Sequence, residues 1–538
     1  MKSVMTHKFS EVPNVSVPRS SFDRSHGYKT TFDSADLVPF YVDEALPGDS
    51  FNLNATLLAR LNTPIFPIMD NMFLDTFFFA VPYRLVWDNW KKFNGEQVDP
   101  GDSIDYTIPI MPSTAITGYA EGSLHDYLGI PPGVPDVDHV SLYHRAYNLI
   151  WNEWFRDQNI QDSVVVDKDD GPDSPADYVL LQRGKRHDYF TSCLPWPQKG
   201  DSISLPLGSS APVLGLGVAD TTWTAGSVAV KETGQSINST YTSYKTIGDA
   251  DGQVPNRVLI EEDPNNTNFP NVIADLSEAT AATINQLREA FQVQKILEKD
   301  ARAGTRYPEM IKSHFGVTSP DARVQRSEYL GGGSQPINIT PVTQQGETGT
   351  TPQGNLAAFS STVSSRNGFV KSFSEHCILI GIVNVRADLT YQQGLNKMFT
   401  RSTRYDYYLP SLAHLGEQAV LHGELFLQDP ATDTGSTGTP DNDKVFGYQE
   451  RWAELRYKPS QITGAFRSSA ATPLDSWHLS QEFSGLQTLS DAFITDNPPI
   501  SRVVATPAQP DFNLDAYINL RCARPMPTFS VPGMIDHF

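Results

Sequence analysis

Apolar and polar residues alternate most regularly near the C-terminus, between Phe512 and Cys522, where every second residue is apolar. A period of two residues is typical of a strand with one buried face and one exposed face. The same alternation predicts a strand that begins at Phe51 and passes through Leu57. Two largely uninterrupted apolar runs, at Asp75–Val81 and His376–Val385, predict strands that are buried on both faces.

Weaker patterns give shorter elements. Glu424–Leu427 and Arg451–Tyr457 are interpreted as short strands, the second with charged residues on its outer face. The triplet Gly331–Gly333 has no helix after it and is interpreted as part of a turn. A phosphate-binding loop is not expected at this triplet, because such loops lead directly into a helix.

A period near 3.6 residues predicts two helices. In Leu142–Phe155 the apolar residues form a broad stripe along one helical face. In Ala279–Ala303 apolar residues recur among charged ones, Asp275 or Ser277 can cap the first turn, and Gly304 follows the last turn. Both helices lie in long connections between predicted strands, so the pattern favours a mainly β protein with a few helices.

Composition divides the chain into four parts. We expect an extended N-terminal arm at 1–50 and the first part of a β-domain with a helical insertion at 51–207. Residues 208–275 are rich in Gly, Ser, Thr and Asn and predict a surface insertion. The long helix and the remaining strands, interrupted by polar loop excursions, follow at 276–538. Many short strands joined by proline-rich corners favour an antiparallel sandwich such as a jelly roll.

Composition and charge limit the classes of function. The 538 residues carry a formal net charge of −21, which disfavours wrapping of nucleic acid over the whole surface, so any DNA contact must be local. Cys193, Cys377 and Cys522 lie too far apart for a zinc motif and are interpreted as small buried residues in a reducing cell. No apolar run is long enough to span a bilayer or to form a signal peptide, so we expect no membrane insertion.

The sequence carries no signature of a catalytic residue, a cofactor or a metal site. The acidic segment Asp162–Asp177 is compared with a calcium-binding loop, but the residues before Gly171 do not have the required spacing. We therefore interpret it as a solvated acidic loop and keep a metal site as the weaker alternative. A pair of carboxylates in a sugar cleft stays open, because 62 acidic residues offer many pairs.

Two groups of basic residues are candidates for contacts with DNA phosphates. One group lies among aromatic residues near the N-terminus and the other forms the densest cationic stretch of the chain: Arg19, Arg24, Lys29, and Arg183, Lys185, Arg186. Cations interleaved with aromatic rings can bind phosphates while the rings stack on bases. The alternatives are an arm whose cations meet an acidic neighbouring subunit, for the first group, and a solvated turn, for the second.

Several long stretches resemble the major capsid protein of gokushoviruses, the Microviridae branch of small icosahedral single-stranded-DNA bacteriophages. They extend from one end of the chain to the other and leave out mainly 208–275 and two smaller excursions. The stretches are PRSSFDRSHGYKTTFDSADLVPFYVDEALPGDSFNLN (18–54), RLNTPIFPIMDN (60–71), DTFFFAVPYRLVWDNWKKFNGE (75–96), QVQKILEKDARAGTRYPEMIKSHFGV (292–317), RWAELRYKPSQITGAFRS (451–468) and PGMIDHF (532–538).

The resemblance implies an eight-stranded antiparallel jelly roll of the viral capsid type, with long loop insertions. Sixty copies would close into a T=1 icosahedral shell around circular single-stranded DNA. Implied partners are an internal scaffolding protein, a DNA pilot protein and a small basic DNA-binding protein. The protein would be part of the virion and would assemble in the cytoplasm of the host bacterium.

The resemblance also implies that the insertion at 208–275 projects at the threefold axes and meets a host-surface receptor. Trp223, Tyr241 and Tyr244 are candidates for its tip, because exposed aromatic side chains anchor contacts. Burial in a small core of the insertion is an equal alternative for these three residues. The rival function for the whole chain is a secreted β-sandwich that binds polysaccharide or cuts it as a glycosidase.

Overall fold

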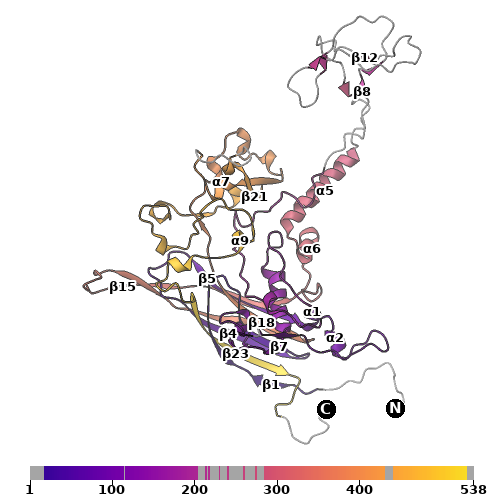
Figure 1. The fold of residues 1–538 in the computed structure, drawn as a ribbon, viewed down its shortest axis with the longest axis vertical. Helices are drawn as coiled ribbons and strands as arrows, with labels where there is room; N and C mark the ends of the chain where they lie inside the picture. The colour runs from indigo at the N-terminus through magenta and orange to yellow at the C-terminus, as the bar shows by residue number, and fades with distance from the viewer. Residues whose placement is uncertain are drawn as a thin grey trace. The chain divides into compact units, whose positions relative to one another are not determined.

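The computed structural model describes residues 17–113, 116–203, 284–430 and 440–529, together with six two-residue strands between 213 and 274. The chain forms two compact units. The main unit comprises residues 1–197 and 301–538, and the second unit comprises residues 198–300. Within the main unit the strands form extended antiparallel sheets, so the protein is mainly β (Figure 1).

The first of the two large sheets has the strand order β1-β23-β4-β17, and β2 pairs with another part of β23. All of its pairings are antiparallel. Its longest strand, β23, pairs along almost its whole length with β4. The strands are β1 (Ser20–Asp23), β2 (His26–Phe32), β4 (Ser50–Leu61), β17 (Thr362–Ser372) and β23 (Phe512–Arg524).

The second large sheet has the order β14-β5-β18-β3 and is also antiparallel. It comprises β3 (Val38–Ala45), β5 (Met72–Pro82), β14 (Glu328–Pro336) and β18 (Cys377–Ala387). The strands β2 and β3 are close in sequence but belong to different sheets. Residues 20–45, which composition placed in an extended arm, are therefore constituents of both sheets.

The main core lies between these two sheets. Alternate residues of β4 and β23, among them Phe51 and Phe512, point into it and are buried, while the residues between them are exposed. Phe78 from β5 reaches the same core from the second sheet. This burial pattern confirms the strands that the alternation predicted around Phe51 and Phe512.

The opposite face of the second sheet is covered as well. A second apolar cluster joins Phe79 and Ile380 to the helices α1 (Tyr83–Val86) and α4 (Leu142–Ile150). This confirms the two strands that were predicted to be buried on both faces. The helix predicted at 142–155 is confirmed too, since α4 continues into one turn of π-helix at Trp151–Phe155.

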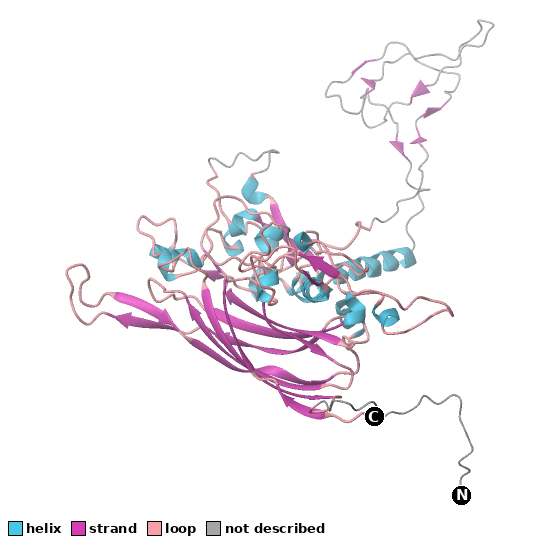
Figure 2. Cartoon of the chain, turned by 60° about the horizontal axis from the view of Figure 1, so that its bottom comes forward, coloured by secondary structure: helices cyan, strands magenta, loops and turns pink. Residues whose placement is uncertain are grey.

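Two long insertions, between β5 and β14 and between β18 and β23, supply most of the helices, which lie on one side of the sheets (Figure 2). Their elements are α2 (Trp90–Phe93), β6 (Ile110–Pro112), α3 (Leu124–Tyr127), β7 (Asp138–Val140), α6 (Tyr307–Phe315), β19 (Thr390–Tyr391), β20 (Glu417–Leu421), α7 (His422–Leu425), β21 (Val445–Glu450), α8 (Ala453–Arg456), β22 (Ser460–Gln461) and α9 (Asp491–Ile494). A hairpin of β15 (Ile339–Thr343) and β16 (Leu356–Ser360) connects β14 to β17.

Two predicted strands are wrong. Glu424–Leu427 overlaps the short helix α7, where the Glu424 carboxylate accepts a hydrogen bond from the Leu421 backbone N–H and so caps the helix. Arg451–Tyr457 contains α8, which follows Trp452 in the left-handed region at φ 69°. A few alternating residues fit one helical turn as well as a short strand, so local pattern could not separate the two.

The glycine triplet lies within β14 and not in a turn. A Cβ atom added at Gly332 would lie 2.0 Å from the Thr76 carbonyl oxygen, and one at Gly331 would lie 2.5 Å from the Gly368 carbonyl oxygen. The missing side chains let β14 approach β5 of its own sheet and β17 of the first sheet. The three glycines in the sequence were therefore a sign of close backbone contact, but the sequence did not show which strands they contact.

The second unit contains three short antiparallel strand pairs and most of the long helix. The pairs are β8 (Val213–Leu214) with β13 (Ile273–Ala274), β9 (Leu216–Gly217) with β12 (Leu259–Ile260), and β10 (Ala229–Val230) with β11 (Ser239–Thr240). The helix α5 (Ile284–Ala303) confirms the predicted long helix from Ile284 onward, and Gly304 follows it with φ +97°. Its predicted start and caps lie outside the described residues.

Candidate functional site

The outer face of the first sheet presents an uncovered row of polar side chains. Because alternate residues of β23 and β4 fill the core, the remaining residues point away from it. We call this surface the polar sheet face; it consists of Asn52, Asn54, Thr56, Arg60, Asn513, Asp515, Tyr517, Asn519 and Arg521, all exposed. Amides, two guanidinium groups, one carboxylate and one aromatic ring make it unsuited to packing in an apolar core.

Strand register orders the polar sheet face. Arg521 lies opposite Asn52, Tyr517 lies opposite Thr56, and Arg60 lies opposite Asn513. Tyr517 is 55% exposed and stands between the two arginines along the strands. Guanidinium and amide groups bind phosphate and sugar oxygens, and an exposed ring offers a stacking surface for bases. This composition fits single-stranded nucleic acid, in which both the phosphates and the unpaired bases are accessible.

The structure brings the first predicted basic group to the edge of the polar sheet face. Arg19 donates from Nη2 to Ser50 Oγ at 2.8 Å. Lys29 forms a short ion pair with Asp515, its partner in the neighbouring strand. Arg24 donates from Nη1 and Nη2 to Asp43 at 2.6 and 3.0 Å. Two of the three predicted cations are thus already paired with carboxylates of the same chain.

An open groove of about 840 Å³ lies at this edge. Lys29, Leu58, Arg60 and Asp515 are among its lining residues, so it continues the polar sheet face towards β2. The sequence analysis did not select Arg60, Tyr517 or Arg521. Their signal was nevertheless present, since they occupy the outward positions of the same alternation that predicted the strands.

The three residues of the second predicted basic group line one groove, but each of them is engaged within the chain. Lys185 is buried, donates to the Phe493 carbonyl at 2.6 Å, and lies 4.5 Å from the centre of the Phe493 ring. Burial lowers the pKa of Lys185 to about 8. Arg183 pairs with Asp75 at 2.5 Å, and the exposed Arg186 lies 3.6 Å from Asp388. These contacts do not support Lys185 as a ligand for phosphate.

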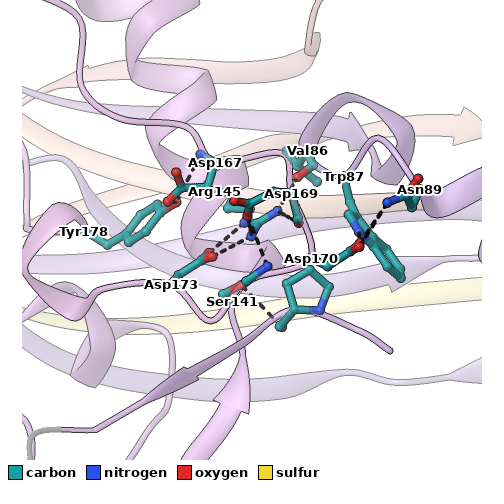
Figure 3. A network of polar contacts seen from close by, with 12 residues as sticks. Val86, Trp87, Asn89, Ser141, Arg145, Asp167, Asp169, Asp170, Asp173 and Tyr178 are labelled. Carbon is teal, nitrogen blue, oxygen red and sulfur yellow. Dashed lines mark hydrogen bonds and ion pairs between the residues drawn. The ribbon is translucent and has the colours of Figure 1, made fainter. Parts of the chain in front are cut away.

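The acidic segment 162–177 is tied to a single buried arginine (Figure 3). Arg145 of α4 donates from Nε and Nη2 to the buried Asp173, and its Nη1 donates to the Val86 and Asp169 carbonyls. Asp170 accepts hydrogen bonds from Asn89 and from Trp87, and these bonds lower its pKa.

Figure 3 also shows Tyr178 beside Asp167, where the hydroxyl donates at 3.0 Å. The expectation of a solvated loop is therefore wrong at Asp173, whose carboxylate is enclosed. Since Arg145 and neutral donors occupy the carboxylates of Asp167, Asp169, Asp170 and Asp173, these four are not arranged as a calcium site. The segment fixes α4 to the loop after β5 and has a structural role.

Trp223, Tyr241 and Tyr244, the predicted tip of the surface insertion, lie outside the described residues. Among the described residues, none of the helices combines the length and the apolar character needed to cross a membrane. The three cysteines are free and buried, as the sequence analysis expected.

Two antiparallel sheets around a common core, with long insertions and an uncovered polar face, are features of a structural β-protein. Sequence comparison defines it further. The capsid protein (F protein) family matches residues 10–534. Capsid protein VP1 of Bdellovibrio phage phiMH2K is 46% identical over 99% of this chain and 98% of its own length.

Capsid protein VP1 of Chlamydia phage 1 is 45% identical, with 99% of this chain and 98% of that protein covered. Capsid protein VP1 of Spiroplasma virus 4 is 36% identical over 98% of this chain and 97% of its own length. The chain therefore belongs to the capsid protein (F protein) family and is a structural component of a virion. The resemblance to gokushovirus capsid proteins is confirmed, and the rival function of a secreted glycosidase is set aside.

Proposed function

We propose that the two large sheets are the halves of an eight-stranded jelly roll. The strands β1 and β2 pair with successive parts of β23 and occupy one strand position. Numbered along the chain, the positions then run 1-8-3-6 in the first sheet and 2-7-4-5 in the second. This order supports two interleaved Greek keys, the arrangement typical of capsid jelly rolls. The two long insertions would follow positions 4 and 7.

Sixty such subunits would close a T=1 icosahedral shell, in which each subunit repeats the same contacts with its neighbours. Exposed aromatic side chains in the insertion between β18 and β23 support subunit contacts there. Phe399, Tyr405 and Tyr407 are 69%, 65% and 57% exposed. Aromatic residues are enriched in protein interfaces, where burial of large rings contributes much of the binding energy.

The genome would lie against the polar sheet face. The observation that supports this is the alignment of Arg60, Tyr517 and Arg521 on one uncovered surface. In β4 and β23 the partners of the two arginines are asparagines, while Asp23 of β1 lies opposite Arg521 on its other side. At a net charge of −21 the subunit cannot neutralise DNA by itself. Arg19 and Arg186 would add local contacts. A small basic DNA-binding protein would supply the remaining positive charge, while an internal scaffolding protein and a DNA pilot protein would act during assembly.

The experiment measures binding of the full-length subunit to a single-stranded oligonucleotide over a range of salt concentrations. Arg521→Ala should reduce the slope of log affinity against log salt by about 0.7, the value for one lost phosphate contact. Tyr517→Ala should weaken binding without changing the slope, because stacking involves no counterion. Arg404→Ala, at an exposed arginine of the insertion between β18 and β23, is the matched control.

Equal slopes for Arg521→Ala, Arg404→Ala and the unchanged protein would contradict the assignment of this face to DNA. Electron microscopy of the subunit, expressed with its scaffolding partner, tests the shell separately. Uniform icosahedral particles are expected, and their knobs should disappear when 208–275 is deleted. Particles that keep their knobs after this deletion would contradict a host-attachment role for the insertion.

A further inference from the structure

Three histidines from different elements meet in the insertion between β5 and β14. His125 belongs to α3, His139 to β7 and His144 to α4. One ligand nitrogen from each ring lies within 4.8 Å of the other two. We call this group the histidine cluster. The sequence analysis did not select these three residues, which are not in a compact motif and which only folding brings together.

The contact between His125 and His144 is the closest in the cluster. Nδ1 of His125 lies 2.8 Å from Nε2 of His144, so the two rings share one hydrogen. The His139 ring lies 5.1 Å from the His144 ring, between centroids. Tyr119 closes one side, with its ring stacked 3.7 Å from His125 and its hydroxyl 2.8 Å from Nε2 of His139.

Backbone carbonyls hold the outer nitrogens of two rings. The Pro175 carbonyl accepts a hydrogen bond from His125, and the Val140 carbonyl lies 3.3 Å from Nδ1 of His139. A carbonyl that accepts from the outer N–H leaves a lone pair on the inner nitrogen. In His139 this nitrogen faces the Tyr119 hydroxyl, and in His125 it faces Nε2 of His144. Histidine ligands of metals are oriented in this way, by an acceptor on the nitrogen that does not bind the metal.

His144 has an unusual environment. The residue is 1% exposed, and among the described residues its Nδ1 has no hydrogen-bond partner. A neutral imidazole has one N–H and one lone pair, so an enclosed ring whose Nδ1 has no partner is poorly satisfied by the protein alone.

From this geometry we propose that the histidine cluster binds one divalent transition-metal ion, with Zn²⁺ as the ion best suited to three neutral imidazoles. Zinc–nitrogen bonds of 2.0–2.1 Å in a tetrahedron place the nitrogens about 3.3 Å apart. The His125–His144 pair must therefore open by only about half an ångström, and His139 must move inward. Water would take the fourth position, on the side of the Tyr119 hydroxyl.

The ion would link α3, β7 and α4, which are separated by loops but adjoin the core on the outer face of the second sheet. An ion that binds the folded chain and not the unfolded chain stabilises the folded state. The site would therefore strengthen the insertion that carries the Arg145 network, whether or not the subunit has assembled. This inference does not depend on the proposed shell or on the proposed DNA face.

The test uses the full-length subunit, freed of metal by dialysis against a chelator, and titrates it with ZnCl₂ in a calorimeter. One equivalent per chain is expected. Co²⁺ in place of Zn²⁺ should give the visible absorption of a tetrahedral ion, and X-ray absorption should show three nitrogen ligands near 2.0 Å. His139→Gln, at the least buried of the three histidines, should weaken Zn²⁺ binding at least 100-fold.

The control is His414→Ala, because His414 is exposed and lies outside the cluster. It should leave the stoichiometry and affinity unchanged. Circular dichroism verifies that both variants fold. Failure of the unchanged protein to bind one equivalent would overturn the proposal, and so would Zn²⁺ binding that His139→Gln leaves intact.

Discussion

Arg145 holds Asp173 in a two-pronged ion pair that is closed to solvent. Nε and Nη2 of the arginine lie 2.6 and 2.5 Å from the two carboxylate oxygens, and the side chains are 0% and 1% exposed. Parallel hydrogen bonds of this kind fix orientation as well as distance. The acidic segment is thereby attached to α4, and through the Val86 carbonyl to the end of α1.

Removal of the acidic partner should be strongly destabilising. Asp173→Ala leaves the Arg145 guanidinium buried without its carboxylate, and we expect a loss of about 3–5 kcal/mol in unfolding free energy. Urea unfolding of the purified subunit measures it. Asp169→Asn is the matched control, because the Asp169 side chain is 78% exposed and its contact with Arg145 is longer, at 3.4 Å. Equal effects of the two changes would contradict this account.

Gly332 is expected to tolerate no side chain. In Gly332→Ala the new Cβ atom would meet the Thr76 carbonyl oxygen of the paired strand, so β14 and β5 must separate. Overpacking of this kind costs about 3 kcal/mol, measured as a fall in melting temperature. Gly349→Ala provides the comparison, since nothing lies within 4 Å of a Cβ atom there. A normal melting temperature for Gly332→Ala would show that the strands can adjust.

Asp36 should make the stability of the subunit depend on pH. Burial raises the pKa of its carboxyl to about 6, although Gln182 donates a hydrogen bond to it at 3.1 Å. Because the folded chain holds this proton more tightly than the unfolded chain, stability is lost as pH rises from about 4 to 6. Asp36→Asn removes this loss. The unfolding free energy of the variant, relative to that of the unchanged protein, should therefore rise by about 2 kcal/mol between pH 4 and pH 7.

Melting curves at both pH values test this expectation. Asp88→Asn, at an exposed carboxylate, should follow the unchanged protein throughout. If the difference between Asp36→Asn and the unchanged protein is the same at pH 4 and at pH 7, the Asp36 carboxyl does not titrate in this range.

The three cysteines should be unreactive in the folded subunit. All are buried, and burial raises the pKa of the Cys193 and Cys377 thiols, that of Cys377 to about 12. Because the thiolate is the reactive form, a thiol reagent should label none of them until urea unfolds the chain, when all three should react. Rapid labelling of any one thiol in the native subunit would contradict its burial.

Sequence patterns predicted the long elements correctly where burial follows a regular period. The strands around Phe51 and Phe512, the apolar strand that contains Phe78, and the helix α4 are of this kind. The predicted strands at Glu424–Leu427 and Arg451–Tyr457 failed, because each of these segments is only about as long as one helical turn. At Glu424 a side-chain cap, and at Trp452 a left-handed backbone, decided the local structure, and neither leaves a periodic signal.

The sequence by itself determined which residues face the core, because alternation and hydrophobic burial are local properties of each strand. It thereby determined the outward row that contains Tyr517 and Arg521. Tertiary structure alone decided which distant residues meet. Asp173 reaches Arg145, Lys185 turns inward to Phe493, and His125, His139 and His144 converge. Such contacts depend on how two long insertions fold back onto the sheets, and no local period along the chain encodes that path.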